Sequence, residues 1–139
     1  MKFNYSNQPK NKFAVIPFCE NWELKDFQII NNYIPINEEA FKSIYQIKEF
    51  ISSFGSVKNI YQDSKEYIFI NIGKKEDINI ENLRKYASIA LGQAKSEFIT
   101  DIDIILIYKE FGIDLNDAVY SIIESLSLSN YTFNHFKSK

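Results

Sequence analysis

The stretch Tyr67-Ile-Phe-Ile-Asn-Ile72 decides the fold class of this chain. Its side chains are apolar at every position except Asn71, so both faces of a strand built from it would be buried. A strand of this kind lies inside a sheet that helices cover on both sides. Ile102-Asp-Ile-Ile-Leu-Ile107 repeats the pattern. We therefore predict that it is a second central strand.

Two segments near the N-terminus carry less regular signals. Phe13-Ala-Val-Ile16 is short and apolar, and we predict a buried strand that ends at Pro17, which cannot donate a backbone hydrogen bond. Leu24, Phe27 and Ile30 do not alternate as the residues of a half-buried strand do. For 24–30 we expect a short strand or an irregular segment.

A hairpin is predicted in the middle of the chain. Val57-Lys-Asn-Ile-Tyr61 has strand composition and precedes the strand at 67–72. The polar residues between them include Asp63 and Ser64, which are common in turns. This hairpin adds an antiparallel pair, so the sheet should be mixed.

Three helices are predicted from apolar residues that recur every three or four positions. Asn37, Asn79 and Asp114 precede them, and each side chain can cap a helix by accepting backbone N–H groups. Gly55 stands where the first helix should end. The predicted buried faces are Ala40, Ile44, Ile47, Ile51 and Phe54 in the first helix; Ile80, Leu83, Tyr86, Ala87, Ala90, Leu91 and Ala94 in the second; and Leu115, Ala118, Val119, Ile122, Ile123 and Leu126 in the third.

This order of elements predicts an α/β fold with a mixed, mostly parallel sheet flanked by helices on both faces. A chain of 139 residues is long enough for one such domain. We expect a flexible lead-in at 1–12, a single α/β domain at 13–130, and at 131–139 an aromatic and basic tail in which the last helix runs out.

Composition argues against several classes of partner. The net charge is −2, so no strong field draws the chain to nucleic acid or to an anionic membrane. No apolar run approaches the roughly 20 residues that a membrane helix needs. The N-terminus lacks the apolar core of a signal peptide, and the single cysteine fits a reducing compartment. We expect a cytoplasmic protein without membrane contact.

Residues able to carry chemistry are sparse. One histidine and one cysteine cannot make a zinc site at the usual ligand spacings. Asp101 and Asp103 lie at the start of the strand predicted at 102–107, and we interpret them as solvated charges at the strand end. Cys19 is interpreted as a buried, inert thiol, and His135 as a side chain of the tail.

One loop could bind an anion. Gly73, Lys74 and Lys75 lie between a strand and a helix N-terminus, where backbone N–H groups can hold a phosphate. The Gly-x-x-x-x-Gly-Lys-Ser/Thr pattern of a P-loop is absent. The alternative is a simple turn in which Gly73 supplies a positive φ.

Two stretches resemble a known family, the leucyl (cytosol) aminopeptidases. In its N-terminal domain a strand ending in Gly-Leu-Gly-Lys precedes a helix that begins near Glu-x-Leu-Arg. Here Asn71-Ile-Gly-Lys74 and Glu81-Asn-Leu-Arg84 occupy those places. The family domain closes in Tyr-x-Phe-x-x-Tyr-Lys-Ser/Thr-Lys. This chain closes in Tyr131-Thr-Phe-Asn-His-Phe-Lys-Ser-Lys139, with Phe136 for the second Tyr.

The resemblance implies a macro-domain-like fold and a role as the non-catalytic N-terminal domain of a cytosolic, metal-dependent leucyl aminopeptidase. The parent would remove N-terminal amino acids from peptides as a homo-hexamer. Its two divalent metal ions, Zn or Mn, would lie in a separate C-terminal catalytic domain. None of the family's metal ligands or catalytic residues matches a position here, so we assign no catalytic residue and no cofactor to this chain. The implied start of the interdomain linker is Tyr131, Phe133, Phe136, Lys137 and Lys139.

Two other functions stay open at this point. A macro-like sheet could bind a nucleotide or ADP-ribose at the carboxyl ends of its strands, with the loop at 73–78 as its anion contact. The domain could also be an accessory surface that contacts DNA. The acidic balance and the single arginine, Arg84, argue against DNA binding by the isolated domain.

Overall fold

The computed structural model of the protein describes residues 11–99 and 101–137, with side chains described as far as residue 128. The described chain forms a sheet of four strands in the order β2-β3-β1-β4. β1 is parallel to both β3 and β4, and β2 is antiparallel to β3. The prediction of a mixed, mostly parallel sheet is confirmed. The strands are β1 (Phe13–Phe18), β2 (Val57–Gln62), β3 (Lys65–Asn71) and β4 (Asp103–Ile104).

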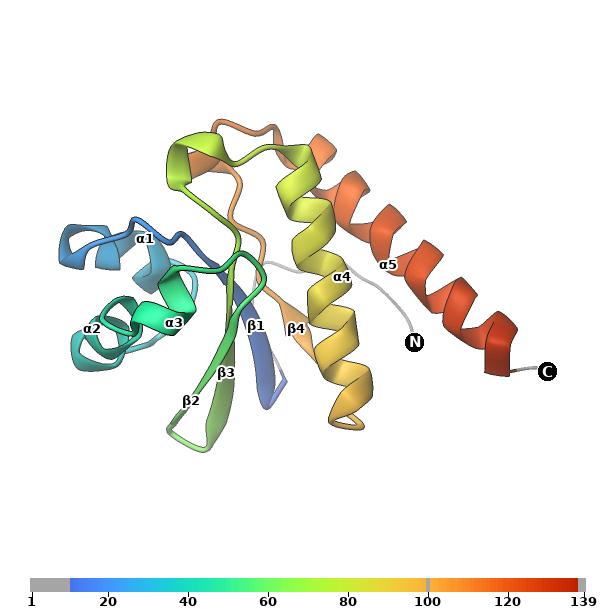
Figure 1. Cartoon of the computed structure of the whole chain (residues 1–139), viewed down its shortest axis with the longest axis horizontal. Coiled ribbons are helices and arrows are strands. Elements are labelled where there is room, and N and C mark those ends of the chain that lie inside the picture. Colours follow the sequence, from blue (N-terminus) through green and yellow to red (C-terminus); the bar gives the residue numbers. More distant parts are fainter. Residues whose placement is uncertain (1–10, 100, 138–139) are drawn as a thin grey trace.

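Helices cover the sheet from two sides (Figure 1). On one side lie α1 (Phe27–Asn31), α2 (Glu38–Tyr45) and α3 (Lys48–Ile51), and on the other lie α4 (Ile80–Ser96) and α5 (Leu115–Lys137). Short 3-10 turns are η1 (Leu24–Asp26), η2 (Lys75–Asp77) and η3 (Lys109–Phe111). The α/β class is confirmed, whereas the likeness to a macro domain is not. Among the described residues, no helix has the length and apolarity needed to cross a membrane.

The two inner strands are buried on both faces, as the sequence of β3 predicts. On the side of α2 and α3, the Phe18 ring contacts four other aromatic rings at centroid distances of 5.1 to 5.9 Å, those of Trp22, Phe41, Phe50 and Phe69. Ile68 and Ile70 alternate with Phe69 and so face the side of α4. A cluster of aromatic rings therefore lies on one side of the sheet, and isoleucine side chains of β3 face α4 on the other.

The prediction of one long helix after Asn37 is wrong, because the chain forms two short helices there, α2 and α3. Residue Ile47 has extended backbone angles and separates α2 from α3. Phe41 and Phe50 are nine residues apart, so one continuous helix would point them in opposite directions. The break turns both rings towards Phe18. As a consequence Phe54, which we predicted to be buried, is 44% exposed.

The segment 24–30 is helical rather than a strand or an irregular segment. It contains η1 and most of α1. The Phe27 ring packs on Phe41 at 5.5 Å, and Ile30 is fully buried. A spacing of three between apolar residues suits one face of a helix, and tertiary contacts with α2 stabilise so short an element.

The hairpin and the helix caps are confirmed. Asp63 and Ser64 both have positive φ, as the tightest hairpin turn requires. Asn37 accepts a hydrogen bond from the Ala40 backbone N–H at 2.8 Å, and Asn79 forms a reciprocal capping box with Asn82. The caps of α2 and α4 therefore follow directly from side-chain chemistry. At α5, Asp114 accepts the Asn116 N–H at 3.0 Å.

The predicted central strand at 102–107 is wrong in length and position. β4 has two residues and lies at the sheet edge. Val15 accepts a hydrogen bond from the Ile105 N–H at 2.9 Å, and in a parallel ladder the next bond would run from residue 17 to the Ile105 carbonyl. Pro17 has no N–H to donate, so the ladder ends there.

The Tyr86 side chain supplies the hydrogen bond to Ile105 that Pro17 cannot donate. Its phenol O–H lies 2.7 Å from the Ile105 carbonyl oxygen and 2.8 Å from that of Val15, and its single hydrogen is shared between them. The side chain is fully buried, and burial raises its pKa well above the ordinary value. A side chain of α4 thus fastens the segment after β4 to β1.

Phe98 has an unusual backbone conformation. It follows α4 with φ 55° and its side chain is 91% exposed. Ile99 donates to the Ala94 carbonyl at 2.8 Å and Phe98 to that of Lys95 at 3.3 Å, which is the Schellman pattern of a helix end. Glycine usually occupies this position, because a side chain there is strained.

We predict that Tyr86→Phe destabilises the protein by about 1 to 2 kcal/mol, because the buried Ile105 carbonyl loses its donor. Thermal unfolding followed by circular dichroism measures the effect, as a loss of about 4 °C in Tm. Tyr120→Phe on α5 is the matched control, since that ring is 67% exposed, and it should leave Tm unchanged. Equal melting of both variants would contradict the role of the phenol.

We predict that Phe98→Gly stabilises the protein by about 0.5 to 1 kcal/mol, because glycine removes the strain of a positive φ. Urea unfolding measures the difference. Phe98→Ala is the control, since it removes the exposed ring but keeps a Cβ. If alanine stabilises as much as glycine, the backbone conformation is not the cause.

Candidate functional site

The loop after β3 contains the predicted anion contacts, Gly73, Lys74 and Lys75. Gly73 has φ 101°, the positive value that the turn interpretation requires. Its N–H donates to the Asn71 side chain at 2.8 Å, and its carbonyl accepts from the Glu20 N–H at 2.9 Å. The Lys75 N–H donates to the Asn21 side chain at 2.9 Å. Two backbone donors of this loop are therefore already bound to asparagine side chains.

The same loop holds an anion of its own, the Glu76 carboxylate. Its pKa is lowered, first by a hydrogen bond from its own backbone N–H and then by the side-chain amide of Asn21, which donates at 2.9 Å. Because the folded pKa is lowered, these contacts stabilise the protein above the unfolded pKa and are lost as the pH falls through the folded value. An external anion would have to bind through the exposed side chain of Lys74 and the half-buried side chain of Lys75, and this stays a prediction.

Asparagine side chains also join this loop to α4 and α3. The Asn82 amide donates to the Ile72 carbonyl at 3.0 Å, and the Asn71 amide donates to the Phe50 carbonyl at 2.8 Å. Asn71 is fully buried, so its amide must be paired. The carboxyl end of β3, where open α/β sheets usually bind ligands, is in this chain closed by its own polar groups.

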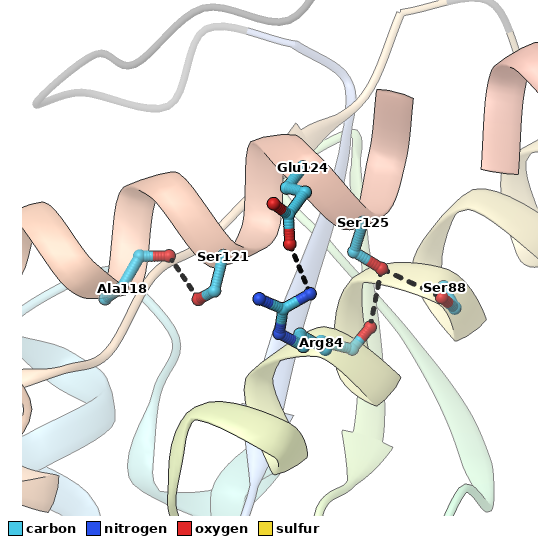
Figure 2. Close-up of polar contacts among 6 residues, drawn as sticks. All are labelled: Arg84, Ser88, Ala118, Ser121, Glu124 and Ser125. Carbon is cyan, nitrogen blue, oxygen red and sulfur yellow. Dashed lines mark hydrogen bonds and ion pairs between the residues drawn. The ribbon is translucent and has the colours of Figure 1, made fainter. Parts of the chain in front are cut away.

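A second candidate is the seam between α4 and α5, shown in Figure 2. The Ser125 hydroxyl donates to the Arg84 carbonyl at 3.0 Å and lies 3.0 Å from the Ser88 hydroxyl. The Arg84 guanidinium forms an ion pair with Glu124, and both side chains are about one-third exposed. Such a pair contributes about 0.5 kcal/mol in solvent. The ion pair therefore adds little to the seam, and the buried apolar side chains of the two helices contribute more.

The sequence did not reveal this seam. We predicted an apolar face on α5, yet Ser121 and Ser125 are buried beside Ala118, Ile122 and Leu126. Their hydroxyls find acceptors on backbone carbonyls, Ser121 on Ala118 at 3.0 Å. Serine at helical spacing between apolar residues was the available signal, and small side chains allow helices to approach closely.

A groove of 510 Å³ opens beside this seam. The Lys85 ammonium lies 5.6 Å from the centroid of the Phe54 ring at its border. The described lining of the groove offers both apolar and polar contact surface. The lining residues are Phe54, Glu81, Arg84, Lys85, Ser88, Ile89, Ser125 and Leu128.

The remaining candidates have structural surroundings. Cys19 is fully buried, and burial raises the pKa of its thiol far above the ordinary range, so the inert interpretation holds. Asp103 is not a solvated charge as predicted, because Asn11 donates to both of its carboxylate oxygens, at 2.7 and 3.0 Å. This contact fastens the start of β1 to β4. In the described parts of the chain, no group of three or more His, Cys, Asp or Glu side chains could hold a metal ion.

The ends of the chain are described only in part. The backbone of Tyr131, Phe133, Phe136 and Lys137 continues α5, whereas their side chains and the whole of Lys139 lie outside the described residues. His135 is likewise described by its backbone only. Of the lead-in predicted at 1–12, residues 11 and 12 are described, and the Lys12 carbonyl accepts from the Glu66 N–H at 2.9 Å.

Fold and site together define a small α/β domain with two helix-covered faces and an exposed groove. Over residues 19–139 the sequence matches the model described as the cytosol aminopeptidase family, N-terminal domain. The chain belongs to this family, and the resemblance seen in the sequence is confirmed. No curated protein matches the chain.

We predict that Asn21→Ala raises the pKa of Glu76 part of the way to its ordinary value, because the backbone N–H remains and the amide donor is lost. Asn21→Asp should raise it further, since a like charge then faces the carboxylate. An NMR titration of the Glu76 carboxyl carbon measures both. An unchanged pKa in the two variants would show that Asn21 does not hold this carboxylate.

Proposed function

We propose that this chain is the non-catalytic N-terminal domain of a cytoplasmic, metal-dependent leucyl aminopeptidase that removes N-terminal amino acids from peptides. The observation that carries the proposal is the family match, which begins directly after β1 and includes every later element of the fold. The described residues do not fit the family's metal ions, since they contain no cluster of metal-binding side chains. No catalytic step is therefore derived for this chain.

The domain's partner would be the catalytic domain of the same polypeptide, where two divalent metal ions, Zn or Mn, would activate a water molecule and polarise the scissile carbonyl. The groove between Phe54 and Leu128 supports a role in contact, because the two apolar side chains at its border are 44% and 61% exposed. The linker would start in the last turns of α5, from Tyr131 onwards. Assembly into a homo-hexamer is part of the proposal.

The proposal predicts a division of activity between two polypeptides. With Mn²⁺ or Zn²⁺ added, the 139-residue chain should not hydrolyse leucine p-nitroanilide. The product of the coding frame read on past Lys139 should hydrolyse it, and that frame should encode Lys, Asp and Glu metal ligands.

Release of nitroaniline, followed by absorbance, decides between the two. Metal-dependent hydrolysis by the 139-residue chain would show that this domain is itself catalytic, and it would contradict the proposal. A coding frame that continues without such ligands would equally contradict the proposal.

A further inference from the structure

The two edges of the sheet differ. β4 at one edge has two residues, and Asn11 binds its Asp103 side chain. β2 at the other edge has six residues and, among the described strands, pairs with β3 alone. In the described chain, the segment before α2 contacts this edge at the Gln62 end of β2. The Gln62 side chain donates to the Pro35 carbonyl at 2.7 Å and accepts from the Asn37 N–H at 3.2 Å.

The register of the hairpin shows which backbone groups of β2 face outwards. The Asn71 N–H donates to the Ser56 carbonyl at 2.9 Å, so residue 56 belongs to a hydrogen-bonded pair. Such pairs alternate along an antiparallel ladder, so Lys58 and Ile60 also direct their N–H and C=O groups at β3. Val57, Asn59 and Tyr61 therefore direct theirs away from the sheet, and no partner for these groups occurs within the described residues.

The side chains of this edge are unusual for an unprotected strand. The Tyr61 side chain is 75% exposed, whereas that of the preceding residue, Ile60, is half-buried. β2 has no proline and one charged residue, Lys58, whereas edge strands commonly carry several devices against pairing. An open row of backbone groups beside an exposed aromatic ring is a surface that another strand can join.

We propose that a second copy of this chain pairs with β2 through this edge, antiparallel and with the two Asn59 residues facing each other. In this register Val57 faces Tyr61 of the second copy, which gives about six backbone hydrogen bonds, two for each facing pair. Tyr61 and Val57 alternate to the same face of the sheet. The exposed ring of each copy would therefore cover the half-buried Val57 of the other.

Charge supports a second copy in this register. In the proposed register, Lys58 would face Ile60 of the other chain. If the pairing centred on Lys58 instead of Asn59, the two Lys58 side chains would face each other, and their like charges would destabilise the pair. The net charge of −2 produces little repulsion between two copies. The junction is smaller than a standard interface of about 1,600 Å². We therefore expect a weak dimer with a Kd of about 100 µM.

Amide exchange measured by NMR at two protein concentrations tests the pairing residue by residue. For the expected Kd, the amides of Val57, Asn59 and Tyr61 should exchange about fivefold more slowly at about 1 mM than at high dilution. The amides of Lys58 and Ile60 should not change, because they are bound within the hairpin at any concentration. Exchange of the outward amides that does not depend on concentration would overturn the proposal.

Sedimentation velocity of matched variants gives the second test. Asn59→Pro removes the outward N–H but leaves the hydrogen bonds between β2 and β3 intact, because an edge strand tolerates proline where its N–H faces solvent. We expect this variant to raise the Kd of the dimer at least about tenfold. Asn59→Ala is the control for the lost side-chain bond to Glu66, and it should dimerise like the parent. A dimer that survives Asn59→Pro uses another surface and refutes the assignment. If the proline variant does not fold, the amide exchange of the parent decides.

Discussion

The burial of β1 and β3 on both faces is the constraint to which the rest of the fold responds. A doubly buried strand needs cover from two sides, and the chain provides it with two kinds of packing. Aromatic rings around Phe18 fill the side of α2 and α3, while aliphatic side chains meet α4 on the other. The break between α2 and α3 exists because both Phe41 and Phe50 must reach the same ring.

Asparagine and tyrosine side chains pair several backbone polar groups of this core, often with partners distant in sequence. Asn71 and Asn82 bind backbone groups at the carboxyl end of β3, and Tyr86 supplies the hydrogen bond that Pro17 cannot give. Each pairing removes the cost of a buried unsatisfied group. In the described chain, one buried polar side-chain atom without a partner remains, the Trp22 indole nitrogen, and we have no physical account of it.

The described surface of the domain combines one closed strand end with two open regions. The carboxyl end of the central strands is closed by the chain's own amides and by the Glu76 carboxylate. The described residues also leave open the groove along α4 and the edge of β2. Under the proposed function, these two surfaces would contact the catalytic domain and a second copy of the chain.

The sequence alone determined the elements whose causes are local. The caps at Asn37 and Asn79, the turn at Asp63 and the double burial of β3 follow from side-chain chemistry and periodicity. The stretches 71–84 and 131–139 together indicated the family. Tertiary structure decided the break at Ile47, the helical form of 24–30, the short β4 and the α4–α5 seam. Each of these depends on a partner distant in sequence, such as Phe18 for Phe50 or Tyr86 for Ile105, and no local pattern records which residues will meet.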